Sequence, residues 1–473
     1  MRRTRVLVLL AVFALALGAA ACGDDEKSTS PTTAKGATTA PKSTEPLTAS
    51  FRGVTADSIK IGIPYVDYKS IEQYVDETHG DQKAIYQAVI DDINENGGVL
   101  GRKLVPVFKE YVPIDPTAPN GSLALCTVFT QDEEVFAVLG VYIDFSGDSQ
   151  LCLTRDKETI HIGHELDASM IEQSIQGLLL TPDRTSDRST DILLNVLDQE
   201  GTLDGKKVAI MADSEREGAT KGVEETFDKM GVDRGSTAVL AIAGEDTAAA
   251  QSQLDAFLEK WDTEGVDALF VMGLKSAAEQ FIVKVKDKLP DLQLIFESDS
   301  SARTAATKLV QAGTDPNPYE GALVLQGQSE TEQYNTKAFQ DTCLKAYKTQ
   351  TGKDIVDPAD WKPGADGSTI NKEFIGLRDA CDEIYALVAI AEKAGPNLTN
   401  DTWIDAVNSF GPIKLSGVQP YASFGKGKYE ADDGARLAAW NSSISGSGDY
   451  EPVTDLVNTA EGSSGDTSST TSG

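Results

Sequence analysis

The sequence predicts an α/β protein whose parallel sheets are covered by helices on both faces. From Ser58 onward, short runs of aliphatic and β-branched residues alternate with amphipathic stretches. This alternation is typical of parallel strands joined by crossover helices. It begins again at Ser186 with the same cadence. The strands could form one barrel or two doubly wound lobes, and the second start favours two lobes.

The expected elements follow the chain in a regular order. A short apolar run bounded by turn residues predicts a buried strand, and apolar residues at helical spacing predict an amphipathic helix. Residues 85–93 form one such helical face, which Gly97 and Gly98 end. The expected strands are 59–63, 104–108, 136–140, 160–162, 207–211, 239–242, 269–272, 292–296 and 322–325. The other expected helices are 185–197, 248–261 and 276–289.

The first 21 residues have the layout of a secretory signal peptide. Three arginines precede an apolar stretch at 6–17, and small residues then lead into Cys22. The apolar stretch is too short to be a comfortable membrane span. The segment also resembles the lipobox of bacterial lipoproteins, although Ala19 stands where that motif more often has Leu. We expect lipidation of Cys22 and an extracytoplasmic protein anchored to the outer face of the cell membrane; the alternative is a secreted protein cut at another alanine.

Composition limits the partners of the folded part. Residues 22–56 are rich in Ser, Thr, Pro, Ala and Lys and predict a flexible linker, and residues 458–473 predict a disordered tail. What remains of the 473 residues is long enough for two ordinary domains. The formal net charge is -32, which repels nucleic acid and anionic lipid headgroups. We therefore expect no nucleic-acid partner.

The cysteines are interpreted as one lipid site and two disulfides. If Cys22 carries the lipid, an even number of cysteines remains in an oxidising compartment. The simplest pairing joins neighbours in the sequence, Cys126 with Cys152 and Cys343 with Cys381. Zinc is the competing use of cysteine, but the chain contains no Cys-x-x-Cys motif.

The segment 58–103 resembles the start of a known family. It contains Ile59-Lys60-Ile61-Gly62-Ile63, then Asp91-Asp92-Ile93-Asn94, then Gly97-Gly98-Val99-Leu100-Gly101-Arg102-Lys103. This order is similar to the start of type I solute-binding proteins, in the branch of the Leu/Ile/Val-binding proteins of ABC importers. Later segments agree in outline up to residue 441.

The resemblance implies two Rossmann-like lobes joined by a hinge, with a ligand in the cleft between them and no enzymatic activity. It places residues 57–181 and 300–395 in the first lobe and residues 182–299 and 396–457 in the second. It also matches a disulfide early in the first lobe to Cys126 and Cys152. The expected partners are a small-molecule ligand and a membrane ABC permease, and we expect a monomer without a metal or another cofactor.

Candidate ligand-binding residues are those that follow the expected strands. In open parallel sheets, ligands collect at the carboxyl ends of the strands, where loops and helix N-termini present free backbone N–H groups. The candidates are Tyr65, Tyr142, Ser146, Gly147, His164, Glu165, Arg216, Lys275 and Asp299.

The resemblance suggests roles for some of these candidates. Ser146 and Gly147 stand where relatives bind a ligand carboxylate, although Ser146 could instead only cap the next helix. Asp299 stands near the acid that relatives place against a ligand ammonium, although it could be a solvated loop residue. Tyr142 would join the first-lobe anchors, and Arg216 and Lys275 would act with Asp299 from the second-lobe side and the hinge.

Departures from the family concern the ligand. The chain has Asp213-Ser214-Glu215-Arg216-Glu217-Gly218 where relatives often have Asp-Ser-x-Tyr-Gly, and His164-Glu165 replaces small residues. These charged and bulky groups favour a small polar solute, such as an amino acid, an amide or a related compound, over a plain aliphatic amino acid. Two alternatives remain: a ligand-sensing receptor lipoprotein that feeds a signalling partner, and a metal-dependent hydrolase using His161, His164 and Glu165.

Overall fold

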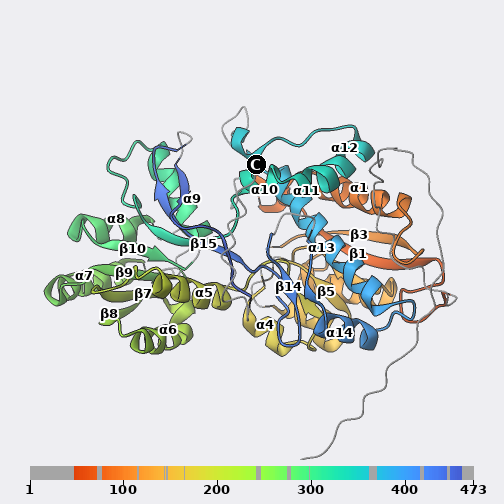
Figure 1. Ribbon diagram of the computed structural model, residues 1–473, viewed down its shortest axis with the longest axis horizontal. Helices are drawn as coiled ribbons and strands as arrows, with labels where there is room; N and C mark the ends of the chain where they lie inside the picture. The colour runs from red at the N-terminus through yellow and green to blue at the C-terminus, as the bar shows by residue number, and fades with distance from the viewer. Residues whose placement is uncertain are drawn as a thin grey trace, which may run out of the picture. The chain divides into compact units, whose positions relative to one another are not determined.

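Two mainly parallel sheets form the framework of the protein in the computed structural model (Figure 1). The structure describes residues 47–71, 77–113, 115, 117–142, 144, 147–164, 166–240, 247–273, 279–297, 299–361, 370–415, 420–444 and 448–460. The predicted signal peptide, the lipidation site Cys22 and most of the predicted tail therefore lie outside the described residues. Among the helices that are described, none combines the length and apolarity needed to cross a bilayer.

The first sheet has the strand order β3-β1-β4-β5-β6, and all of its pairings are parallel. Alternate residues of β1 point to opposite faces, so Ile61 and Ile63 pack in one core while Gly62 faces the other. A Cβ at Gly62 would come within 2.6 Å of the Phe129 ring, which explains a glycine inside this strand. Strand β3 is the edge of the sheet and contains Pro106.

The elements that pack with the first sheet come from two stretches of the chain. The first stretch contains β1(Ser58–Val66), β2(Glu77–Thr78), α1(Gln82–Glu95), β3(Lys103–Tyr111), α2(Ser122–Thr127), β4(Ala137–Leu139), α3(Asp148–Leu151), β5(Ile160–Ile162), α4(Ala168–Gln173) and β6(Leu179–Leu180). The second contains α10(Glu330–Tyr334), α11(Lys337–Phe339), α12(Lys345–Thr351), β12(Ile370–Asn371), α13(Glu373–Ala394), α14(Asn400–Asn408), β13(Gly411–Pro412) and β14(Ser423–Phe424). We call this assembly the first lobe.

The second sheet has the order β16-β15-β11-β10-β9-β7-β8, with β17 pairing β15. Its strands from β8 to β11 are parallel, and β15 joins them antiparallel. In β7 the alternation again serves two cores: Met211 packs with Trp261 on one face, and Ile210 packs with Phe227 on the other. A strand that is buried on both faces reads as a continuous apolar run, as predicted for 207–211.

The second lobe is likewise built from two stretches. The first contains α5(Ser186–Gln199), β7(Lys207–Asp213), α6(Glu217–Met230), β8(Asp233–Leu240), α7(Thr247–Glu264), β9(Ala268–Met272), α8(Glu279–Lys288), β10(Gln293–Phe296), α9(Asp299–Gln311) and β11(Leu323–Gln326). The second contains β15(Gly434–Asn441), β16(Asp449–Pro452) and β17(Val457–Asn458). In Figure 1, α5 to α9 lie together, and β15, from the end of the chain, lies among them.

The chain passes between the lobes at three crossovers, residues 181–185, 327–329 and 430–433. The boundaries expected from the resemblance were at 181, 300 and 395, and the second and third crossovers lie farther along the chain than the last two of these. Helix α9 and strand β11 pack in the second lobe, and Trp403 of α14 packs in the first. The strand–helix alternation is the same in both lobes, so it could not tell which sheet a strand joins.

Other predictions need smaller corrections. The predicted linker ends too late, because residues 47–56 pack on the first lobe: Val54 is buried, and Ser50 donates to the Leu398 carbonyl at 2.8 Å. The strand expected at 239–242 begins at Asp233, and helix α6 was not predicted. Both predicted disulfides are present, Cys126–Cys152 and Cys343–Cys381.

Candidate functional site

The carboxyl ends of the strands carry polar side chains in both lobes. In the first lobe, Tyr65 lies near the end of β1, Tyr142 follows β4 and His164 follows β5. In the second lobe, Arg216 follows β7 and Glu297 follows β10. The structure thus places these residues at the sheet edges where an open parallel sheet binds ligands.

The loop after β4 is held by a buried carboxylate. Asp144 accepts hydrogen bonds from the Ser149 backbone N–H at 2.9 Å and from the Ser149 hydroxyl at 2.5 Å. Gly147 has a φ of 75°, which lets the chain turn into α3. The predicted ligand residue Ser146 lies outside the described residues, so its expected role stays a prediction.

Tyr142 packs inside the first lobe. Its side chain is 2% exposed and lies between the rings of Tyr111 and His161, with centroids 5.8 and 5.3 Å away. Burial raises the pKa of Tyr142 well above its usual value, and its hydroxyl has no hydrogen-bond partner within the described residues. Tyr65 is half-buried, and burial together with Glu110 raises its pKa.

His164 joins β5 to a group of carboxylates that sequence reasoning missed. Its Nδ1 lies 2.6 Å from Oδ2 of Asp183, in the first crossover. Its Nε2 lies 3.5 Å from Oε1 of Glu383 and 3.8 Å from Oδ1 of Asp379, both in α13. Tyr86 of α1 donates to Oε2 of Glu383 at 2.6 Å. Three segments of the first lobe and one crossover therefore meet at His164.

The charges of this cluster are coupled. Burial disfavours a charged imidazole, but Asp183 and Asp379 raise the pKa of His164 well above its usual value. Burial also opposes ionisation of Asp183, but the His164 charge lowers its pKa. Burial raises the pKa of Glu383 to about 8, against the weaker opposing effect of His164. At neutral pH the cluster therefore holds a charged His164 and a protonated Glu383.

A second network ties the strand ends of the second lobe together. Arg216 contacts Asp187 at 3.0 Å through Nη1 and Glu297 at 3.1 Å through Nη2. Glu297 also accepts from the Gly273 backbone N–H at 2.6 Å and from the Thr190 hydroxyl at 3.2 Å. Burial opposes the charge on Arg216, but Glu297 and Asp187 raise its pKa.

Gly273 allows this approach between strand ends. Its φ is +71°, and a Cβ there would come within 2.4 Å of Cγ of Arg216. Glu297 was not predicted as a site residue, although it directly follows an expected strand, as Arg216 and the other candidates do. Asp187 had no such signal, because it lies in the first turn of α5.

The other predicted ligand residues lie outside the described part of the chain, either entirely or in their side chains. Glu165 and Lys275 lie outside the described residues. Asp299 begins α9, and its side chain is likewise outside them. In the part of the chain that the structure describes, no three His, Cys, Asp or Glu side chains are arranged to hold a metal ion.

Charged side chains that sequence reasoning missed also link two crossovers. Arg184 donates to the Gly434 carbonyl at 2.6 Å and pairs with Asp432 at 3.4 Å. Arg188 pairs with Asp433, which also pairs with Lys428 at 3.2 Å. Burial lowers the pKa of Lys428 to about 8.

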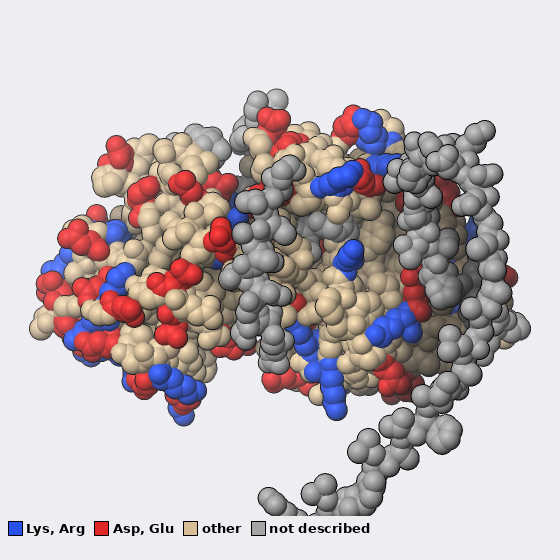
Figure 2. Space-filling model, in the orientation of Figure 1, with Lys and Arg blue, Asp and Glu red and all other residues tan. Residues whose placement is uncertain are grey.

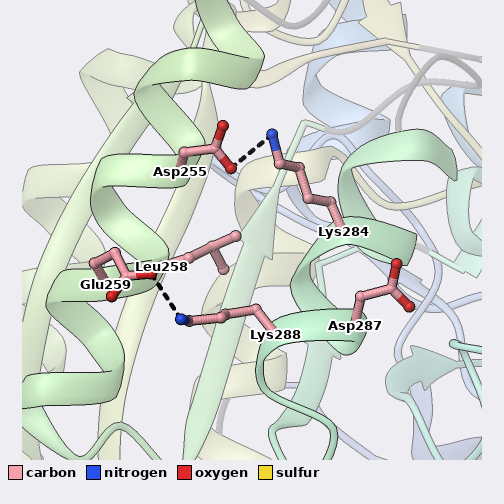
Figure 3. Close-up of a pocket in the computed structure, with 6 residues that line it drawn as sticks. All are labelled: Asp255, Leu258, Glu259, Lys284, Asp287 and Lys288. Carbon is pink, nitrogen blue, oxygen red and sulfur yellow. Dashed lines mark hydrogen bonds and ion pairs between the residues drawn. The ribbon is translucent and has the colours of Figure 1, made fainter.

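A surface depression lies elsewhere, between α7 and α8 (Figure 3). It is crossed by two ion pairs, Asp255–Lys284 and Glu259–Lys288, each at 2.6 Å. These pairs neutralise both lysines, and the depression is formed by helices rather than by strand ends. Acidic and basic side chains are intermixed over the face shown in Figure 2.

Similarity to known proteins is found at the level of the whole fold. No protein-family model matches the chain, and no curated protein matches its sequence. An ABC transporter substrate-binding protein from Desulfitobacterium hafniense, in complex with Leu, matches with a TM-score of 0.56 and 17% identity, over 84% of this chain and 100% of that chain. A fatty acid ABC transporter substrate-binding protein from Thermomonospora curvata matches with a TM-score of 0.54 and 16% identity, over 87% and 95%.

A third solved structure carries an aromatic acid. It is a solute binding protein of an ABC transporter from Rhodopseudomonas palustris BisB5, in complex with 3,4-dihydroxy benzoic acid. Its TM-score is 0.53 at 16% identity, over 85% of this chain and 98% of that chain. The similarity therefore covers both lobes rather than one.

Proposed function

Because the chain has the fold of the type I periplasmic-binding proteins, as its sequence predicted, we propose that it is the solute-binding protein of an ABC importer. It binds a small polar solute between its lobes and makes no chemical change in it. Solute that contacts both lobes stabilises a closed form, and the membrane permease recognises that form. The protein acts as a monomer outside the cytoplasm, anchored through a lipid on Cys22.

One observation carries the proposal: Arg216 offers a donor at the end of β7. Its Nη atoms are engaged by Asp187 and Glu297, but its buried Nε–H has no hydrogen-bond partner within the described residues. A buried donor without a partner costs free energy that an acceptor on a solute would recover. An acceptor such as a carboxylate, an amide oxygen or a hydroxyl would therefore bind there.

The other contacts follow the sequence analysis. Tyr142, Ser146 and Gly147 would serve from the first lobe, with Tyr65 and Glu165 beside them. Lys275 and Asp299 would act with Arg216. His164 was also expected to contact the solute, but both of its ring nitrogens face carboxylates of the protein.

The solute can be sought by thermal shift on the mature chain. Related folds are named for leucine, fatty acid and dihydroxybenzoic acid ligands, so the panel should contain amino acids, amides, ureas, aromatic acids and fatty acids. A solute at a hundred times its Kd stabilises the folded state by roughly 2.7 kcal/mol. If no compound in this panel raises the Tm, the proposed ligand class is wrong.

Arg216→Met then tests the site. With a solute from the panel, we expect the Kd to rise by about tenfold or more, because a hydrogen bond from a charged donor is lost. Arg234→Met is the matched control, since Arg234 also contacts two carboxylates, Asp228 at 2.7 Å and Glu224 at 3.5 Å, but lies near the start of β8. Equal affinities of both variants, measured by calorimetry, would remove Arg216 from the site.

A further inference from the structure

His164 occupies a position between the body of the first lobe and the first crossover. Its side chain is 4% exposed. One ring nitrogen faces Asp183, in the crossover, and the other faces Asp379 and Glu383, in α13. Arg378, next to Asp379, also acts electrostatically on Asp183. The first lobe therefore presents two cations to one carboxylate of the crossover.

The residues beside Asp183 bond to the third crossover rather than to the body of the first lobe. Arg184 bonds the Gly434 carbonyl and pairs with Asp432, both at the third crossover. The Thr181 N–H donates to the Tyr429 carbonyl at 3.0 Å, and the Ala431 N–H donates to the Thr181 carbonyl at 2.9 Å. The first and third crossovers are thus bonded to each other. Within them, Asp183 is the residue that contacts His164.

His161 provides an internal comparison. It is also fully buried, three residues earlier, but its Nδ1 faces the Val138 carbonyl at 3.2 Å. Burial lowers the pKa of His161 to about 4, whereas the carboxylates around His164 raise the pKa of that residue. His161 is therefore a neutral core histidine, and His164 is a buried cation among acids.

We propose that His164 is a positioning residue that fastens the crossovers to the first lobe through Asp183, rather than a contact for the solute. The inference builds on the proposed function, in which the lobes move about these crossovers. Loss of the imidazolium would leave Arg378 as the first-lobe cation that still acts on Asp183 and Asp379, and the buried Asp379 would have one cation fewer. The crossovers would then open more often while the cores stay intact.

The groups that face His164 determine how pH affects this anchor. They are Asp183 from the first crossover, Asp379 and Glu383 from α13, and His161 from the same segment. Arg378 faces Asp183, and Tyr86 of α1 bonds Glu383. Deprotonation of His164 at alkaline pH would remove the cation from this set, and ionisation of Glu383 would add an anion. The added anion favours the charged form of His164, so it is the deprotonation of His164 that weakens the anchor as pH rises.

Hydrogen exchange followed by mass spectrometry on the mature, solute-free chain tests the proposal. In His164→Asn, whose amide can still donate to Asp183 but carries no charge, we expect exchange at 181–185 and 429–433 to accelerate about tenfold relative to the sheet cores. His161→Asn is the matched control, and the crossovers should exchange in it as in the wild type. Equal acceleration in both variants would overturn the proposal.

Two further measurements keep the test decisive. Asp183→Asn removes the charge of the same ion pair from the crossover side and should accelerate the same segments if His164→Asn does not fold. In the wild type, exchange of the crossovers, corrected for intrinsic rates, should rise from neutral to alkaline pH more than exchange of the cores. A flat wild-type profile contradicts the proposal. None of these measurements uses a solute, so a failed ligand screen leaves their outcome intact.

Discussion

Glu383 is an acid inside the first lobe that stays protonated at neutral pH. It accepts from Tyr86, and burial raises its pKa to about 8. The folded state therefore keeps a proton that the unfolded state releases above the usual glutamate pKa. Stability contributed by this group falls as pH rises from that usual value to about 8 and is constant above it.

Glu383→Gln should remove this dependence. The amide oxygen can still accept from Tyr86, and no proton is lost on unfolding. We expect the free energy of unfolding of the variant to rise relative to that of the wild type as pH rises from 4.5 to about 8, by about 4 kcal/mol at the upper end. Urea unfolding across this range measures the difference. The exposed Glu225→Gln should instead follow the wild-type curve, and a constant offset in Glu383→Gln would contradict the reasoning.

At the scale of elements, helix α13 connects the His164 cluster to a disulfide. Cys381 lies in this helix between Asp379 and Glu383 and is bonded to Cys343. Both cysteines are fully buried in the main core of the first lobe. The disulfide therefore fixes the segment of helix from which the carboxylates reach His164.

Replacing Cys343 and Cys381 together by serine should cost about 4 kcal/mol of stability, because the bond closes a loop with a sequence separation of 38. Urea unfolding gives this value. The paired Cys126→Ser and Cys152→Ser variant should cost a similar amount, since its separation is 26. Only the variant that lacks Cys343–Cys381 should also accelerate hydrogen exchange at 181–185. The same acceleration in both variants would show that the disulfide in α13 has no specific effect on the crossover.

At the scale of the whole molecule, the net charge of -32 opposes the folded state. Salt screens repulsion between exposed acids, whereas the crossover ion pairs, such as Arg188–Asp433, are largely buried and less screened. Added NaCl should therefore raise the urea midpoint at neutral pH. Near the sequence pI of 4.4, added NaCl should no longer raise the urea midpoint. A lower midpoint with salt at neutral pH would mean that ion pairs contribute more to stability than charge repulsion removes.

The sequence predicted the fold because its signals are local. Strands such as β7 are buried on both faces, so they appear as uninterrupted apolar runs between helical stretches. The lobe boundaries at 300 and 395 failed because the sheet that β11 or α14 joins depends on contacts far along the chain. The disulfide Cys343–Cys381 was predicted from parity and proximity alone, whereas Cys126–Cys152 was also indicated by the family resemblance.

The candidate site was predicted only in part, for the same reason. His164 and Arg216 follow strands, and that position selected them. Their partners Glu383 and Asp187 lie on helices, where an acid is usually a solvated surface residue. Nothing near Glu383 in the sequence indicates that it meets a histidine more than two hundred positions earlier.

Pro106 in β3 has a consequence for encounters between copies of this protein. The strand lies at the edge of the first sheet, and its Val105 is 42% exposed. Such an edge invites a strand from a neighbouring copy. Proline lacks the N–H that a continuous intermolecular ladder requires. Pro106 thus opposes the pairing of this edge with a strand of another copy.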